Sequence, residues 1–292
     1  MKIGMSTYCF RGAFMDGRLD LPGIVRTAAG WGVKHMEIMP MTVNFLERRD
    51  ILEAVKSAAK DSGVEPMCYT FGANFLTAGK DAHDISGEER HAEIERVKKH
   101  IDIAAELGVK LVRHDIGHRP KERTTTRQFD LDLPLVAEVC GEVADYAARY
   151  GIVTNLENHG RHFQGSERVH RLVDAVARPN FRCVVDVGNF CAVDEDPVPA
   201  VMNNLDIASM FHFKDNYIRD RVPDPENWSV SKHGRYLHGA IVGYGDIDLP
   251  RIVDLIRSSG FDGFVSLEYA SNEIESLFGA RRSWECVRAL FA

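Results

Sequence analysis

The sequence lacks paired cysteines, long apolar runs and a recognisable leader. Its six cysteines are scattered over 292 residues without a CxxC pair, so neither a zinc knuckle nor a disulfide framework is indicated. No apolar run is long enough to cross a bilayer, and the N-terminus leads directly into a strand-like pattern. We therefore expect a cytoplasmic protein without a membrane partner.

Clustered basic residues and a glycine-rich phosphate loop are also missing. Lys and Arg number 36 against 43 Asp and Glu, which gives a formal net charge of -7. Nucleic-acid surfaces normally need grouped Lys and Arg, so we expect no nucleic-acid partner and favour a small molecule. An open, doubly wound sheet usually carries a Gly-rich loop after its first strand. Its absence favours a closed barrel over that sheet.

Short β-rich runs alternate with amphipathic stretches from one end of the chain to the other. We expect strands near residues 2–8, 35–39, 65–71, 111–116, 152–158, 181–187, 208–214 and 264–269. Helical patterns occupy residues 21–32, 50–63, 86–108, 131–151, 166–177 and 249–260, several of them ending at glycine. Eight β/α units predict a single-domain (β/α)₈ TIM barrel over residues 1–292.

One long irregular segment, from about residue 216 to residue 246, interrupts this alternation. Such an excursion within a compact domain is more often a functional lid or an interface than a loop without a function. We expect it at the catalytic mouth of the barrel, without a regular element of its own. There it would help to cover the site, with Trp228 and His233 or His238 as covering groups and Trp228 able to stack on a sugar. A disordered surface loop is the alternative.

Four candidate metal ligands stand at the ends of successive predicted strands, namely Glu157, Asp186, His212 and Glu268. The first three are 29 and 26 residues apart, close to the roughly 31 residues of one β/α unit. The last gap is longer by about the length of the irregular segment. Strand alternation turns all four side chains to one side, so we expect them to converge at the barrel mouth.

Three carboxylates and one imidazole form a hard-to-borderline ligand set. This set suits one divalent ion, with Mn²⁺ favoured and Mg²⁺, Co²⁺ and Zn²⁺ compatible. Without a cation the carboxylates would repel one another, and buried like charges need compensation. The alternative is that each residue is an isolated salt-bridge or capping group.

Five motifs in order give the chain a family resemblance. They are Leu-Glu-Asn-His-Gly at 156–160, Val-Asp-Val-Gly-Asn-Phe at 185–190, His-Phe-Lys-Asp-Asn at 212–216, Gly-Tyr-Gly-Asp-Ile-Asp at 243–248 and Ser-Leu-Glu-Tyr at 266–269. The sequence resembles the xylose-isomerase-like TIM barrel superfamily, which includes the sugar phosphate isomerase/epimerase family and barrels like AP endonuclease family 2. The resemblance implies metal-ligand roles for Glu157, Asp186, His212 and Glu268. Asn189 stands where ketose 3-epimerases have a substrate-binding histidine, which counts against a standard ketohexose epimerase, and we place Asn189 among the substrate contacts.

Further candidates surround these motifs. His159 follows Glu157 on the same side of the strand and is a candidate general acid/base or substrate contact, with a structural loop role as the alternative. His114 is a candidate substrate contact at the fourth strand end. Lys214 would neutralise an oxyanion and Arg219 would bind a hydroxyl or phosphate, unless both are solvated surface charges. Glu37 is expected near the substrate or in the structure of the mouth.

The residues and the resemblance together indicate an enzyme. We expect a divalent-metal-dependent isomerase or epimerase that acts on a sugar, keto-sugar or inosose through an enediolate. Glu157 and Glu268 form the acid/base pair that the resemblance implies. A dehydratase or lyase acting on a related polyol carbonyl compound is one alternative, and a non-catalytic sugar-binding barrel is another. Resembling barrels form dimers or tetramers, so we expect a homo-oligomer.

Overall fold

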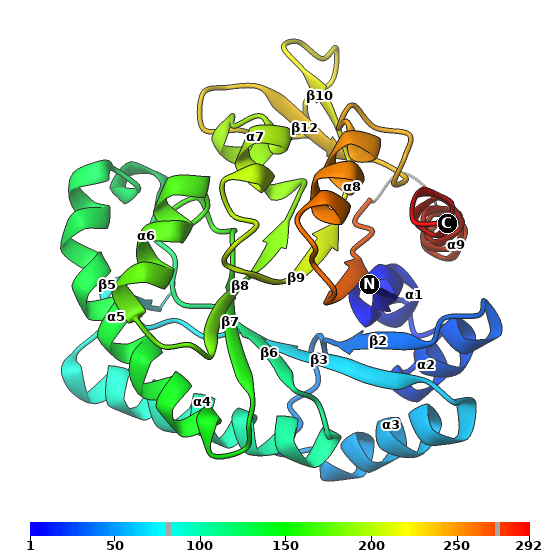
Figure 1. Cartoon of the computed structure of the whole chain (residues 1–292), viewed down its shortest axis with the longest axis horizontal. Coiled ribbons are helices and arrows are strands. Elements are labelled where there is room, and N and C mark those ends of the chain that lie inside the picture. The colour runs from blue at the N-terminus through cyan, green and yellow to red at the C-terminus, as the bar shows by residue number, and fades with distance from the viewer. Residues whose placement is uncertain (80–82, 272–274) are drawn as a thin grey trace.

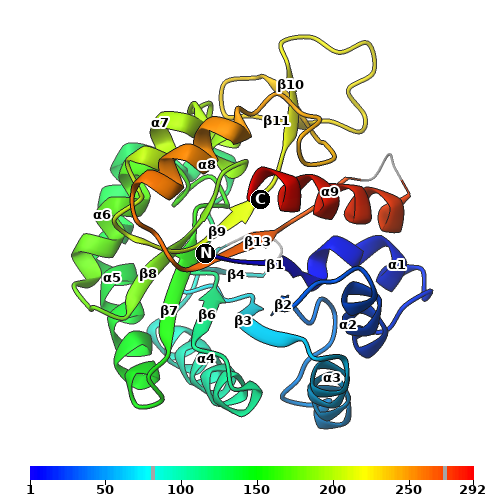
Figure 2. The same cartoon turned by 45° about the vertical axis from the view of Figure 1, so that its right-hand side comes forward.

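Eight parallel strands close into a barrel, as the sequence predicts. The computed structural model describes residues 1–79, 83–271 and 275–292. Around the barrel the strands follow the order β1-β13-β9-β8-β7-β6-β3-β2, and helices surround them (Figures 1 and 2). The strands are β1 (Lys2–Ser6), β2 (His35–Ile38), β3 (Glu65–Phe71), β6 (Leu111–His114), β7 (Val153–Glu157), β8 (Phe181–Asp186), β9 (Ala208–Phe213) and β13 (Phe264–Leu267).

The helices begin and end where local capping chemistry dictates. They are α1 (Arg11–Met15), α2 (Leu21–Gly30), α3 (Arg49–Ser62), α4 (Gly87–Leu107), α5 (Thr126–Ala148), α6 (Ser166–Val176), α7 (Pro197–Met202), α8 (Leu249–Ser258) and α9 (Ser276–Leu290). A capping box of Ser86 and Glu89 starts α4, and Gly108 ends it in the left-handed conformation. The helix expected from residue 131 begins earlier, at Thr126, because the Thr125 side chain accepts the amide hydrogen of Gln128.

The barrel interior changes from apolar at one end to polar at the other. Met67, Leu111, Val184 and Met210 form a small apolar cluster inside the barrel, separate from the main core between strands and helices. Two residues further along β8 and β9, strand alternation turns Asp186 and His212 to the same interior. The apolar cluster therefore excludes water beneath a polar mouth.

Residues 216–246 fold into a small antiparallel sheet rather than an irregular loop. Its strands are β10 (Asn216–Arg219), β12 (Tyr236–Gly239) and β11 (Ser229–Val230), with β12 in the centre. The expectation that the segment has no regular element is wrong, because β10 and β12 pair over four residues each. The Asn216 side chain donates to the Gly188 carbonyl (3.1 Å), just beyond β8. The excursion sheet, defined as β10, β11 and β12, therefore stands at the C-terminal ends of the barrel strands, at the upper edge of Figure 1.

Shorter elements complete the described chain. These are the 3₁₀ helices η1 (Thr7–Phe10), η2 (Lys121–Arg123) and η3 (Asn189–Val193) and the two-stranded sheet of β4 (Thr77–Ala78) and β5 (His83–Asp84). Among the described residues, no helix combines the length and the apolarity that crossing a bilayer requires.

A buried ion pair ties together the loops that follow β6 and β7. The guanidinium of Arg119 donates to both oxygens of the Asp132 carboxylate (2.9 Å to Oδ2 and 2.6 Å to Oδ1), and Nε2 of His162 lies 2.8 Å from Oδ2. All three side chains are buried. Because separating a buried pair leaves an uncompensated charge, this cluster fixes both loops on helix α5.

Helix α4 packs on β3 through a buried histidine. The Tyr69 hydroxyl lies 2.9 Å from Nδ1 of His100, and the His100 ring stacks on Phe71 with 4.5 Å between ring centroids. Burial lowers the pKa of His100 to about 4. The neutral imidazole is therefore the form that the fold accommodates.

The low pKa of His100 predicts an acid-sensitive contribution to stability. In the unfolded chain histidine titrates near 6.5, so unfolded molecules take up the proton first, and stability falls as the pH drops from about 6.5 towards about 4. We expect His100→Gln, which keeps a neutral hydrogen-bonding group beside Tyr69, to lose less unfolding free energy over this window, by roughly 1–3 kcal/mol. Urea denaturation at about pH 7 and about pH 4.5 measures the difference, and equal losses in parent and variant would contradict it.

Candidate metal centre

Four adjacent barrel strands deliver the predicted ligands to one point. Glu157 ends β7, Asp186 ends β8, His212 lies in β9, and Glu268 directly follows β13. One ligand atom from each residue can be chosen so that all four atoms lie within 4.8 Å of one another. The strands are neighbours in the order β7-β8-β9-β13, and Asp186 pairs in register with His212. The convergence expected from spacing and alternation is thus present.

The donor atoms of this cluster suit a divalent cation. Asp186 and His212 are fully buried and Glu157 is nearly so. Oδ2 of Asp186 and both ring nitrogens of His212 are buried without a hydrogen bond of good geometry. Buried polar atoms in proteins nearly always have a partner, and a carboxylate–imidazole set is what Mn²⁺, Mg²⁺, Co²⁺ or Zn²⁺ would bind. The residues therefore fit the predicted ion.

Glu37 fixes the orientation of His212. Its Oε2 atom lies 2.9 Å from Nε2 of His212, while Nδ1 faces Glu268 (3.1 Å to Oε2) and Glu157 (3.5 Å to Oε1). The hydroxyls of Thr70 and Ser266 donate to the Glu37 carboxylate and hold it in place. Although burial opposes protonation, Glu37 and Glu157 raise the pKa of His212 well above its usual value. The arrangement leaves Nδ1 as the ligand atom, with Glu37 as its supporting carboxylate.

The Asp186 carboxylate is held by backbone groups. Its Oδ1 atom accepts from the amides of Gly188 (2.8 Å) and Asn189 (3.0 Å). The Asn158 side chain donates to the Asp186 carbonyl (2.9 Å) and accepts from the Asp186 amide (2.7 Å). Burial raises the pKa of Asp186 to about 6. These contacts direct Oδ2 to the centre of the cluster.

Arg113, which the sequence did not single out, connects Glu157 to a second polar group. Its Nη2 atom lies 2.6 Å from Oε2 of Glu157 and 2.8 Å from Oδ1 of Asp115. The same Asp115 oxygen is 2.6 Å from Nε2 of His159. Although burial opposes it, Arg113 and His212 hold the pKa of Glu157 well below its usual value. A continuous row of polar contacts thus connects Glu157 to His159 through Arg113 and Asp115.

Lys214 and Asn189 also belong to the centre. Nζ of Lys214 lies 2.7 Å from Oε1 of Glu268, 3.0 Å from Oδ2 of Asp186 and 3.2 Å from Oδ1 of Asn189. Nδ2 of Asn189 donates to Oε1 of Glu157 (2.9 Å). Both residues therefore touch the predicted ligands. Their assignment as substrate contacts stays a prediction, and their observed role is to hold the carboxylates.

Two other candidates lie away from the four ligands. His114 is fully buried on the outer side of β6, where Phe71 and Phe75 pack around its ring. Neighbouring side chains on a strand point to opposite sides, so Arg113, and not His114, faces the barrel interior. Arg219 is partly exposed on β10 and pairs with Asp246. Within the described residues, neither the His114 nor the Arg219 side chain contacts a metal-ligand candidate. The substrate roles of these two residues stay predictions.

Comparison with known proteins supports the fold. The model of the xylose isomerase-like TIM barrel family matches residues 25–290. No curated protein matches the sequence. Among solved structures, the 3-keto-D-glucoside 4-epimerase of E. coli has a TM-score of 0.70 at 18% identity, over 99% of each chain.

Two further structures are similar to the same extent. The probable 3-DHS dehydratase of Bacillus anthracis has a TM-score of 0.71 at 16% identity, over 98% of this chain and 99% of that one. The IOLI protein with a bound zinc atom has a TM-score of 0.72 at 18% identity, over 99% of this chain and 98% of that one. At these identities the similarity shows the shared fold alone.

The contact between Glu37 and His212 predicts a measurable effect on metal binding. We expect Glu37→Gln to weaken Mn²⁺ binding by about 10- to 100-fold, because the amide no longer supports the ligand nitrogen of His212 with a negative charge. Isothermal titration calorimetry measures the affinity. Glu65→Gln, at the exposed start of β3, is the matched control and should bind Mn²⁺ like the parent. Equal affinities in Glu37→Gln and the control would contradict the supporting role.

Proposed function

Because the chain belongs to the xylose isomerase-like TIM barrel family, we propose that it is a divalent-metal-dependent isomerase or epimerase acting on a sugar, keto-sugar or inosose. The observation that carries the proposal is the meeting of Glu157, Asp186, His212 and Glu268 at the barrel mouth, with donor atoms within 4.8 Å of one another. We propose Mn²⁺ as the ion, and Mg²⁺, Co²⁺ and Zn²⁺ fit the same donors. The similar IOLI protein was solved with zinc.

A bound divalent ion would polarise the substrate carbonyl and stabilise negative charge on its oxygen. Glu157 and Glu268 stand on β7 and just after β13, with Asp186 and His212 on the two strands between them. They therefore approach a substrate in the mouth from two sides. One carboxylate takes the proton from the carbon beside the carbonyl, and the other returns a proton to the same or the neighbouring carbon. Return to the same carbon on its opposite face gives epimerisation, whereas return to the neighbouring carbon gives isomerisation.

The neighbouring side chains give these two carboxylates different settings. Glu157 is held at both oxygens, by Asn189 and by Arg113. Glu268 lies against the ammonium group of Lys214 (2.7 Å), which would also neutralise a developing oxyanion. His159, held by Asp115, stands within reach of a substrate hydroxyl as a further proton carrier.

A dehydratase is the second candidate, and the pairing of His159 with Asp115 favours it. An imidazole held by a carboxylate is suited to protonate a leaving hydroxyl after the same proton abstraction. One similar structure is a probable 3-DHS dehydratase and another is a 3-keto-D-glucoside 4-epimerase. Both reactions begin by removing a proton next to a carbonyl, so one assay separates them.

We also propose that the chain works as a homodimer or homotetramer, which sedimentation equilibrium would test.

Deuterium exchange tests the proposed reaction directly. We expect the Mn²⁺-loaded protein in D₂O to place deuterium on carbon in at least one of a panel of ketoses, keto-sugars and inososes, without loss of water. Loss of water with exchange would indicate the dehydratase, and no exchange with any compound would favour a non-catalytic sugar-binding barrel. Glu157→Gln and Glu268→Gln should each abolish exchange while the circular dichroism spectrum stays unchanged, because the amide keeps the shape and loses the basicity. Near-normal exchange in both variants would remove them as proton carriers.

The pairing of Asp115 with His159 predicts a change in rate without a change in metal binding. We expect Asp115→Asn to lower kcat by about 10-fold or more, because His159 loses the charge that orients it. Mn²⁺ affinity should stay within about twofold of the parent, since Asp115 touches none of the four ligand residues directly. Asp130→Asn, on the exposed side of α5, is the control. An unchanged kcat, or a loss of metal affinity equal to the loss of rate, would contradict this role.

A further inference from the structure

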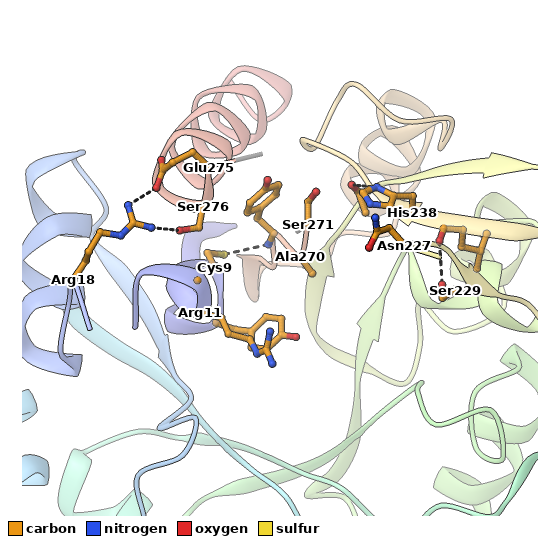
Figure 3. Close-up of a pocket in the computed structure, with 15 residues that line it drawn as sticks. Cys9, Arg11, Arg18, Asn227, Ser229, His238, Ala270, Ser271, Glu275 and Ser276 are labelled. Carbon is orange, nitrogen blue, oxygen red and sulfur yellow. Dashed lines mark hydrogen bonds and ion pairs between the residues drawn. The ribbon is translucent and has the colours of Figure 1, made fainter. Parts of the chain in front are cut away.

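A pocket of about 520 Å³ lies beside the metal centre and is not part of it. Its walls come from three segments: η1 with α1, the excursion sheet, and the residues that follow β13. Figure 3 shows Arg18, Glu275 and Ser276 on one side of the pocket and Asn227, Ser229 and His238 across from them. None of the four metal-ligand candidates lines this space.

The pocket reaches the metal centre through the end of β13. Tyr269 lines the pocket and directly follows Glu268 in the chain. Sγ of Cys9, another lining residue, donates to the Leu267 carbonyl (3.1 Å) and accepts from the Tyr269 amide (3.2 Å). The floor of the pocket is therefore bonded to the backbone on both sides of Glu268. Because its walls follow the adjacent strands β1, β13 and β9, the pocket lies at the same mouth of the barrel as the metal centre, next to Glu268.

Among the lining residues that the structure describes, the charges largely cancel. Arg18 pairs with Glu275 (2.6 Å), and the same guanidinium pairs with Asp16 (2.8 Å) outside the pocket. Arg11 forms no ion pair with any part of the chain that the structure describes, and it presents its N–H donors to the space. A phosphate or carboxylate placed here would face the Glu275 carboxylate as well as Arg11. The wall therefore suits an uncharged polar ligand better than an anion.

The remaining lining groups match a sugar ring. Tyr8, Asn227 and Ser276 offer hydroxyl and amide groups that both donate and accept hydrogen bonds, and the Ser229 hydroxyl, which donates to the Leu237 carbonyl, can accept one. Leu237 and Tyr269 add apolar surface, which packs against the C–H face of a pyranose. The volume lies within the range of small-molecule sites, which is roughly 300–1,000 Å³. A single monosaccharide bound at the metal centre would leave this space unfilled.

We propose that the pocket binds a second sugar ring, so that the substrate of the enzyme is a glycoside or disaccharide-derived keto-sugar rather than a free monosaccharide. The proposal rests on the proposed function, because the metal centre must hold the first ring. The reacting carbons then lie beside Glu268, and the glycosidic bond leads past Tyr269 towards the excursion sheet. Arg11 and Ser229 are the residues that select for the second ring.

Binding measured without turnover tests the pocket separately from the reaction. The probes are D-glucose, the disaccharides trehalose, maltose and cellobiose, and glucose 6-phosphate, titrated by calorimetry into the metal-free and the Mn²⁺-loaded chain. Ser229→Trp fills the pocket, and Val230→Trp is its control on the opposite face of the same strand. Arg11→Ala removes a donor from an exposed position that tolerates change, with Arg26→Ala on α2 as its control.

We expect at least one disaccharide to bind about tenfold or more tightly than glucose, with or without Mn²⁺, since several added hydrogen bonds are worth at least that factor. Ser229→Trp and Arg11→Ala should bring this ratio close to one, whereas Val230→Trp and Arg26→Ala should retain it. Glucose binding as tight as every disaccharide, or tightest binding of glucose 6-phosphate, would overturn the proposal. Disaccharide binding without any deuterium exchange would instead count against the proposed reaction and leave the pocket assignment standing.

Discussion

The concentration of negative charge in the barrel mouth is the constraint on which the rest of the site depends. Four carboxylates lie around His212, namely those of the buried residues Glu37, Glu157 and Asp186 and that of the partly buried Glu268. Burying like charges together is unfavourable unless cations compensate for them. Arg113 and Lys214 supply two positive charges and protonated His212 a third. One negative charge among these groups remains unbalanced.

A divalent ion would resolve this imbalance. If His212 bound the ion through a neutral ring nitrogen, it would give up one positive charge, and the ion would add two. The four carboxylates would then face four positive charges. This count explains why the donor atoms of Asp186 and His212 are left without good hydrogen bonds in the chain alone. The same excess of carboxylates, Glu37 and Glu157 first among them, raises the pKa of His212 although burial opposes this.

The sequence predicts the convergence of the four candidate ligands better than it predicts the residues that support them. Glu157, Asp186 and His212 follow the length of a β/α unit, and the topology of a barrel alone brings them together. The sequence did not identify Arg113 as part of the site, because the choice between Arg113 and His114 depends on which of these two neighbours faces the barrel interior. A shift of one residue in the strand register reverses that choice. Histidine is also the more usual active-site residue, so the sequence favours His114. The contact of Glu37 with His212 crosses the barrel and leaves no trace in local spacing.

The excursion sheet likewise depends on long-range contacts that the sequence pattern did not predict. Its prolines and glycines suggested an irregular loop, yet Asn216 and Gly239, 23 residues apart in the chain, begin an antiparallel pairing. Such pairing depends on long-range contacts that local propensity does not reveal. The early start of α5 is different, because Thr125 was a capping residue visible in the sequence. Local signals therefore allow prediction of caps and strand ends, whereas side-chain facing and sheet pairing require the structure.

The two sides of the barrel mouth differ in how firmly their loops are held. The loops after β6 and β7 carry Asp115 and His159, and the buried cluster of Arg119, Asp132 and His162 fixes them to α5. Proton transfer requires this rigidity, because it works only within hydrogen-bonding distance. Across the barrel, the segments after β1, β9 and β13 surround the open pocket with exposed side chains. In the proposed reaction, changes in exposed side chains such as Asn227 and Ser229 would alter recognition without displacing a candidate metal ligand, and each side of the mouth would supply one proton carrier, Glu157 on one side and Glu268 on the other.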